Sequence, residues 1–158
     1  MLTVEKIGGT SMSQFGEVLK NIMLRDPKAI YGRVYVVSAY AGVTNDLLEH
    51  KKTGAPGIYA KFAQGEACGP AMDALTAKLV GINKDLQPLG LDLAKANAFL
   101  EKRMRELKAY LDSMRHVLAS GYLARDNVLL AAREMLAAIG EAHSAYNSCE
   151  ILPAQGYA

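Results

Sequence analysis

The chain has few of the residues that build metal centres and disulfide scaffolds. Its 158 residues include only two cysteines, Cys68 and Cys149, and no tryptophan. The cysteines lie far apart and form no C-x-x-C pair, and the three histidines are scattered along the sequence. Neither a metal-ligand spacing nor a disulfide framework is therefore present. We expect two reduced thiols and no metal site made of protein side chains.

Long apolar runs and blocks of like charge are also missing. No apolar stretch approaches the roughly 18 residues of a membrane-spanning helix. Glu5 and Lys6 interrupt the N-terminal segment where a signal peptide would need an apolar core. The formal net charge is only +2, without a basic run. These absences argue against a membrane or a nucleic acid as the main partner, and we expect a cytoplasmic protein.

The composition that remains is typical of a folded domain. Hydrophobic residues make up 51% of the chain and charged residues 22%, which is the balance of an ordinary globular protein. A chain of this length can bury a core of its own. We therefore expect one folded unit rather than a disordered segment.

The first fifty residues have the pattern of a strand, a helix and a second strand. Residues 2–7 alternate as a strand does, and the apolar run within 33–38 fits a strand buried on both faces. Between them, Ser11 and Gln14 match the S-x-x-Q capping box that opens helices. Such a βαβ unit makes the two strands parallel and adjacent. The loops that follow both strands should then meet at one edge of the sheet.

The remainder of the chain is predicted to be mostly helical. A short helix is expected at 46–50, then a glycine-rich connection over 51–69 with one helical turn at 58–63. Long helices are expected at 70–88, 92–119 and 126–152, the last beginning at an Asp126 N-cap and stopped by Pro153. In the second of these, apolar or small residues recur in steps of three and four, which predicts one buried stripe.

Glycines interrupt these patterns at two places. Gly8 and Gly9 separate Lys6 from two hydroxyl residues, an arrangement that fits either a plain turn or a phosphate-binding loop of backbone N–H groups. It matches neither GxxxxGK[ST] nor GxGxxG. Gly140 lies inside the third long helix beside Glu141, where glycine costs about 1 kcal/mol relative to alanine. A close approach of the backbone would account for both positions.

Three segments together carry a resemblance. They are VEKIGGTSM at the N-terminus, VVSAYAGVTNDLL after the second strand and IGEAHSAYNSCEIL in the last helix. In this order they resemble the aspartokinases of the amino-acid kinase family, with their motifs V-x-K-F-G-G-T-S, V-V-S-A-x-x-G-V-T-N and G-E-x-x-S. The chain departs from them at Ile7 and at Ala142 and His143. The stretch EHKKTGAPGIYAKF also looks like the aspartokinase variant encoded beside ectoine-synthesis genes.

The resemblance implies a fold and a reaction. The fold would be α/β, the N-terminal portion of the amino-acid kinase fold, with a small parallel sheet and a layer of long helices. Residues 1–158 would form a truncated catalytic domain without the later G-R-G-G-S-D segment or the regulatory ACT domains. The parent enzyme would transfer the γ-phosphoryl group of ATP, with Mg²⁺, to the side-chain carboxylate of L-aspartate. We expect this truncated chain to be inactive alone.

The resemblance also assigns roles to residues. Lys6 would neutralise phosphate charge and the Gly9 N–H would line the path of the phosphoryl group, which makes these two the expected catalytic residues. Glu141 would pair with the α-ammonium of aspartate, and Gly140 would let its helix approach the ligand. The expected ATP-binding residues are Lys6, Gly8, Gly9, Thr10, Ser11 and Ser38. The expected aspartate-binding residues are Ser38, Ala39, Gly42, Thr44 and Glu141.

Other interpretations of the same residues stay open. Glu141 could be a solvated helix charge and Thr44 a helix cap. The whole chain could be a non-catalytic binding module that retains half of a phosphate site. In either case the short sheet would leave an apolar edge and helix faces uncovered, which predicts a homo-oligomer, most simply a dimer.

Overall fold

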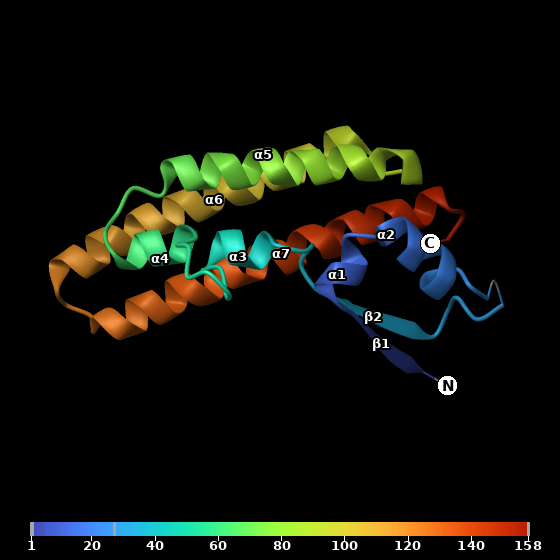
Figure 1. The fold of residues 1–158 in the computed structure, drawn as a ribbon, viewed down its shortest axis with the longest axis horizontal. Coiled ribbons are helices and arrows are strands. Elements are labelled where there is room, and N and C mark those ends of the chain that lie inside the picture. The colour runs from blue at the N-terminus through green and yellow to red at the C-terminus, as the bar shows by residue number, and fades with distance from the viewer. Residues whose placement is uncertain (1, 27, 158) are drawn as a thin grey trace.

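A small parallel sheet lies beside a layer of long helices (Figure 1). The structure is a computed structural model that describes residues 2–26 and 28–157. In chain order the elements are β1 (Thr3–Ile7), α1 (Gly9–Met12), α2 (Phe15–Val18), the π-helical turn η1 (Leu19–Met23), β2 (Arg33–Val37), α3 (Val43–Leu47), α4 (Ile58–Ala63), α5 (Gly69–Leu86), the 3-10 turn η2 (Gln87–Leu89), α6 (Leu93–Ser120) and α7 (Arg125–Ala154).

The predicted pairing of the two strands is confirmed. β1 and β2 are parallel neighbours in a register that runs from Thr3 opposite Arg33 to Ile7 opposite Val37. The prediction that the second strand is buried on both faces is wrong. Val36 is 49% exposed, because no element within the described residues packs on that face of the sheet. Only the opposite face, which carries Ile7 and Tyr35, packs toward the helices.

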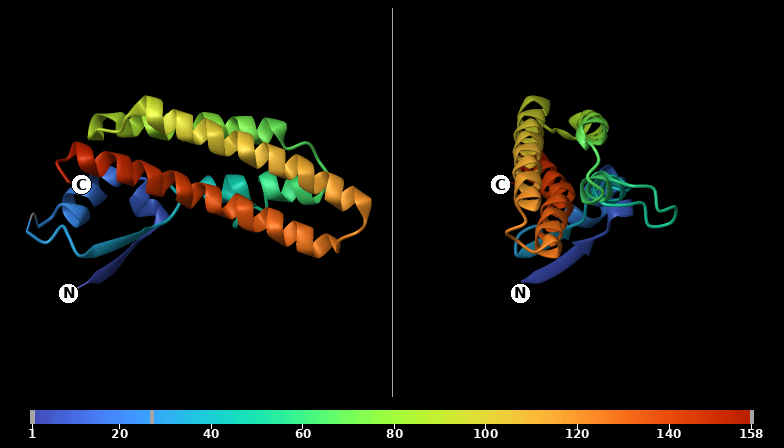
Figure 2. Two further views of the ribbon diagram at one scale, coloured as in Figure 1. Left: turned by 180° about the vertical axis from the view of Figure 1, so that it is seen from behind. Right: turned by 90° about the vertical axis from the view of Figure 1, so that its left-hand side faces the viewer.

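The three long helices are confirmed, including the unbroken course of α6. Successive long helices run antiparallel, and α6 contacts both α5 and α7 (Figure 2). The Asp92 side chain caps α6 by accepting a 3.0 Å hydrogen bond from the Lys95 N–H, and Gly121 ends it with φ +69°. The predicted stripe supplies its buried face, which consists of Ala96, Leu100, Met104, Leu107 and Leu111.

The short helices complete the helical layer. α3 and α4 both contact α7, and α3 also contacts α5. The two short helices therefore cover part of α7 next to α5 (Figure 1). The turn predicted at 58–63 is confirmed as α4. The helix predicted at 46–50 instead spans Val43–Leu47. Val43 and Leu47, four residues apart, are both fully buried, and this pair sets its position.

Several predicted helix boundaries are wrong. The capping box fails because α1 begins at Gly9, which places Ser11 inside the helix and Gln14 between α1 and α2. α7 begins at Arg125, one residue before the expected Asp126 cap. It also continues through Pro153 to Ala154, since Ile151 is fully buried and holds the last turn in place.

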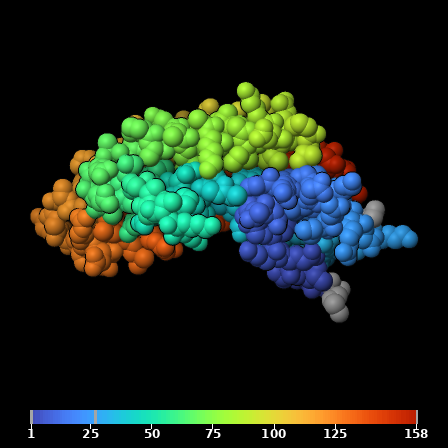
Figure 3. All heavy atoms as spheres, in the orientation of Figure 1, coloured from blue at the N-terminus to red at the C-terminus, as the bar shows by residue number. Residues whose placement is uncertain are grey.

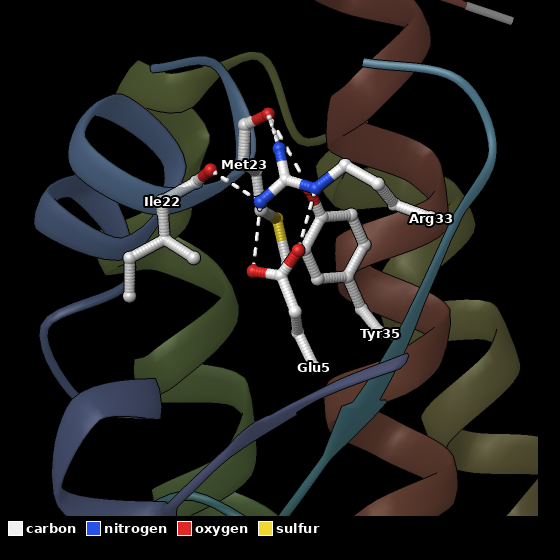
Figure 4. A network of polar contacts seen from close by, with 5 residues as sticks. All are labelled: Glu5, Ile22, Met23, Arg33 and Tyr35. Atoms are coloured by element: carbon white, nitrogen blue, oxygen red, sulfur yellow. Dashed lines mark hydrogen bonds and ion pairs between the residues drawn. The ribbon is translucent and has the colours of Figure 1, made fainter. Parts of the chain in front are cut away.

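The N-terminal residues form a lobe beside the elongated helical body, as the space-filling view shows (Figure 3). Arg33 fastens this lobe (Figure 4). Its guanidinium donates to both carboxylate oxygens of Glu5, at 2.6 and 2.7 Å, and to the backbone carbonyls of Ile22 and Met23. It also lies 4.9 Å from the ring centre of Tyr35. One side chain thereby joins β1, β2 and the free carbonyls at the end of η1.

Replacing Glu5 should therefore destabilise the fold in a pH-dependent manner. The hydrogen bond from Arg33 lowers the pKa of Glu5 below the ordinary value of a glutamate side chain. A carboxyl whose pKa is lower in the folded state stabilises that state at pH values above its unfolded pKa, and this contribution is lost as the pH falls through the folded value. We expect Glu5→Gln to reduce the free energy of unfolding at pH 7, with the difference from wild type shrinking below about pH 4. Urea titrations at both pH values measure it, and a pH-independent difference would contradict this account.

Candidate active site

Three segments far apart in the sequence meet at Ala39. A methyl group added to Gly9 would lie 2.7 Å from the Ala39 carbonyl oxygen. A methyl group added to Gly140 would lie 2.6 Å from the Ala39 Cβ and 3.2 Å from a Val43 methyl. The distances of 2.7 and 2.6 Å to Ala39 are well below van der Waals contact, so only glycine fits at either position. The structure thus brings the three sequence motifs together around Ala39, through its carbonyl oxygen on one side and its methyl group on the other.

The first segment places a lysine beside free backbone donors. The Lys6 Nζ lies 3.4 Å from the position that a Cβ on Gly8 would occupy, and no described carboxylate pairs with this amine. Because α1 starts at Gly9, its first N–H groups have no acceptor within the helix. Thr10 and Ser11 are exposed in this single turn. An ammonium group and N–H donors on one loop suit a phosphate or carboxylate ligand.

The second segment follows β2 and is tied to the first. The Ser38 N–H donates to the Ile7 carbonyl at 3.0 Å, which extends the sheet ladder into the loop. The Ser13 hydroxyl accepts a 2.8 Å hydrogen bond from the Ala41 N–H and donates to the Gly9 carbonyl. The loops after both strands therefore lie side by side, as the parallel pairing predicted.

The turn into α3 depends on Gly42. Its φ of +80° lies in the left-handed region that favours glycine, and it precedes the first residue of α3. Thr44 is half-buried in the first turn of that helix. The Lys78 amine reaches this turn from α5: it lies 3.1 Å from the Cβ position of Gly42 and pairs with Asp46 at 2.6 Å.

The third segment is the middle of α7, whose buried face changes character there. Up to Leu136 the buried residues are apolar, and after it most are small or polar. These are Gly140, His143, Ser144, Asn147 and Ser148. The Ser144 hydroxyl donates to the Ser38 carbonyl at 2.9 Å, which holds the helix against the loop. Glu141 is exposed beside this contact, without an ion-pair partner among the described residues.

Gly140 has a different neighbour from the one that the sequence suggested. We expected this glycine to let α7 approach a ligand directly. Its nearest atoms belong instead to Ala39, Val43 and Leu47. Gly140 therefore lets the helix approach the loop that carries the expected aspartate-binding residues.

Three further residues belong to this arrangement and were not anticipated. Ser13 and Ser144 link the segments by hydrogen bonds, and Lys78 brings a second amine to the loop. Both serines lie inside or next to the quoted motifs, so their place in those motifs was a usable signal. Lys78 gave none, because it looks like any charge on the outer face of a helix.

The described residues offer little to bind a metal ion directly. Within 2–26 and 28–157 no three His, Cys, Asp or Glu side chains gather into a possible metal site. Cys68 is buried and Cys149 exposed, and the two are not bonded to each other. In the same part of the chain no helix is long and apolar enough to cross a membrane.

Comparison with known proteins identifies a relative that matches nearly the whole chain. The chain is similar to an aspartate kinase. The relative, named "Aspartate kinase Ask_Ect", comes from Stutzerimonas stutzeri (strain A1501) and is 44% identical over 161 residues. The match covers 99% of this chain but 34% of the relative, so the chain spans about a third of the relative's length. The similarity to aspartokinases that the three motifs indicated is thereby confirmed.

The other comparisons add no relative. No protein-family model matches the chain. No solved structure matches it either. The mixed α/β architecture with its two-stranded parallel sheet therefore stands on the structure itself.

The contact at Ala39 can be tested with a matched pair of glycine substitutions. Gly140→Ala should destabilise the chain by about 1–3 kcal/mol, because the new methyl group overlaps Ala39. Gly81→Ala, in the interior of α5 with no atom within 4 Å of the new methyl group, should instead stabilise it by about 0.5–1 kcal/mol. Urea unfolding of both variants measures the difference. Equal effects of the same sign would contradict the close approach.

Proposed function

We propose that the chain is the N-terminal part of an aspartate kinase with the amino-acid kinase fold. The longer polypeptide would transfer the γ-phosphoryl group of ATP to the side-chain carboxylate of L-aspartate, which gives 4-phospho-L-aspartate. The observation that carries the proposal is the meeting of the three motifs at Ala39 in a chain that is 44% identical to an aspartate kinase. That contact brings the loops after β1 and β2 side by side, which supports a shared site for phosphate and aspartate.

Lys6 and the backbone after it would handle the phosphates. The Lys6 amine would offset negative charge on the phosphoryl oxygens, and the N–H groups of Gly8, Gly9 and Thr10 would donate to them. The absence of a described carboxylate beside Lys6 supports this role, since an amine already paired with an acid would offer less to a phosphate. Ser11 and Ser38 would add hydroxyl donors near the same edge.

The second and third segments would bind aspartate. The aspartate site would be lined by Ser38, Ala39, Gly42 and Thr44. Glu141 would pair with the α-ammonium group of aspartate. The exposure of Glu141 next to the Gly140 contact leaves its carboxylate accessible to such a ligand. A charge-assisted hydrogen bond of this kind is worth roughly 1.5–3 kcal/mol.

The reaction needs positioning rather than a general base. The side-chain carboxyl of aspartate has a pKa of about 3.9, so it is already ionised at neutral pH. One of its oxygens would attack the γ-phosphorus as the bond to the bridging oxygen breaks, leaving ADP. Lys6 and the Gly9 N–H would stabilise the charge that spreads over the phosphoryl oxygens. Glu141 and the loop would hold the carboxylate in line with the phosphorus.

Mg²⁺ would be held largely by the nucleotide. The described residues form no metal cluster, whereas Mg²⁺ in phosphoryl-transfer sites keeps several waters and binds substrate phosphates. Bound there, it would neutralise charge on the phosphate oxygens. We therefore assign no metal ligand within this chain.

The biological setting belongs to the same proposal. The stretch at residues 49–62 resembles the aspartokinase variant encoded beside ectoine-synthesis genes, so we propose a place in ectoine or aspartate-family amino-acid biosynthesis in the cytoplasm. Because the chain spans about a third of its relative, we also propose that these 158 residues do not catalyse alone. Adenosine would be gripped by other parts of the longer polypeptide.

The activity is tested by trapping aspartyl phosphate with hydroxylamine in the longer polypeptide. Lys6→Ala should abolish the product, and the 158-residue chain should form none. Glu141→Gln should lower kcat/KM for aspartate about ten- to a hundredfold, with the KM for ATP unchanged. Glu134→Gln on the same helix, whose side chain is 70% exposed and about two helical turns before Glu141, is the matched control. Equal loss of ATP and aspartate use would show that Glu141 has another role.

We also propose that the 158-residue chain forms a homodimer through the exposed face of its sheet. Val4, Val34 and Val36 expose apolar side chains there, and a parallel sheet is normally covered on both faces. Light scattering at micromolar concentration should give twice the monomer mass, and Val36→Lys should yield monomer. Leu130→Lys, which replaces an exposed leucine on α7, should leave the dimer intact. A monomeric wild-type chain would contradict the proposal.

A further inference from the structure

A group of buried polar side chains lies behind the loop that carries the expected aspartate-binding residues. It joins Asn83 on α5, His143 and Asn147 on α7, and Tyr40 in the loop after β2. All four are between 0% and 3% exposed, in a helical layer that is otherwise mostly apolar. Buried polar groups of this kind are retained only when hydrogen bonds offset their desolvation.

The hydrogen bonds fix the state of His143. The Asn83 Oδ1 accepts from His143 Nε2 at 2.7 Å and from Asn147 Nδ2 at 2.9 Å, while its own amide donates to Asn97 Oδ1. Since an amide oxygen can only accept, the proton of His143 sits on Nε2. Burial lowers the pKa of His143 to about 4, so the ring is neutral at physiological pH.

Tyr40 connects this group to the loop. Its ring meets the His143 ring edge-on, with the centroids 5.6 Å apart, and its hydroxyl accepts a 3.4 Å hydrogen bond from Asn147. Its backbone carbonyl accepts from the Val43 N–H at 3.1 Å. Tyr40 lies between Ala39, where the three segments meet, and Ala41, which bonds to Ser13. A displacement of the Tyr40 ring would therefore move both neighbours.

We propose that His143 is a positioning residue that acts through Tyr40 to hold loop 38–44 in the geometry that binds aspartate. An apolar side chain of similar size could fill the same volume. It would not orient the Asn83 and Asn147 amides, and it would not fix the position of the Tyr40 ring. This inference rests on the proposed function for its kinetic consequence. Its structural consequence, the rigidity of loop 38–44, holds independently.

The structural consequence is measured by hydrogen–deuterium exchange in the 158-residue chain. The reporters are the N–H groups of Ala41, Val43 and Asp46, each hydrogen-bonded within or next to the loop. His143→Leu removes one of the two donors to the Asn83 Oδ1 and the edge-on ring contact to Tyr40, so exchange at the reporters should rise about five- to a hundredfold. His143→Gln places an amide donor near the position of Nε2 and should restore slow exchange. Tyr40→Phe, which removes one hydroxyl, should raise it about two- to tenfold.

A control separates positioning from general destabilisation. Val128→Ala removes buried methyl groups at the opposite end of α7 and should leave the reporters unchanged relative to amides in α6. If His143→Leu and Val128→Ala raise exchange alike throughout the chain, or if His143→Gln behaves as His143→Leu does, the inference is overturned. If His143→Leu does not fold, the exchange rates of the reporter amides in Tyr40→Phe test the inference in its place.

The kinetic consequence is measured in the longer polypeptide. His143→Leu should raise the KM for aspartate about tenfold while the KM for ATP stays within twofold, and His143→Gln should resemble wild type. A purely structural role would lower the yield of folded protein without changing either KM. If the unmodified polypeptide makes no aspartyl phosphate, the proposed function fails, while the exchange result still decides the role of His143.

Discussion

The close approach of Gly9 and Gly140 to Ala39 is the constraint on which the rest of the structure depends. Gly9, Ala39 and Gly140 lie in three segments more than a hundred residues apart at the extremes, and a methyl group added to either glycine would overlap Ala39. Short side chains let main chains approach, and the approach allows the hydrogen bonds of Ser13 and Ser144 to form. The strand pairing, the loop geometry and the course of α7 all converge on this point.

The polar interior behind that contact follows from it. Where α7 meets loop 38–44, its buried face must satisfy the Ser38 carbonyl and the Tyr40 hydroxyl as well as fill space. Leucine cannot do this, whereas serine, asparagine and histidine can. The buried face of the helix therefore combines two roles along its length: apolar packing in its first half and hydrogen bonding to the loop in its second.

The sequence predicted most of the elements and missed the details that tertiary contacts decide. The long helices and parallel strands were found because periodicity and the strand–helix–strand order are local signals. The Ser11 capping box failed because the fold needs the helix to begin at Gly9, against Ala39. The buried Asn83 and His143 were missed because a polar residue carries no hydrophobic periodicity. Motif order located the candidate site, yet the real neighbour of Gly140 emerged only from the structure.

The meeting of the three segments is tested most directly by a methyl nuclear Overhauser experiment on the 158-residue chain with labelled alanine methyl groups. The account expects a cross-peak from the Ala39 methyl group to the α-protons of Gly140, because a Cβ on Gly140 would lie 2.6 Å from that methyl carbon. The methyl group of Ala109, on the exposed side of α6, should show no such cross-peak and serves as the reference. An assigned Ala39 methyl group without a cross-peak to Gly140 would contradict the convergence and the site built on it.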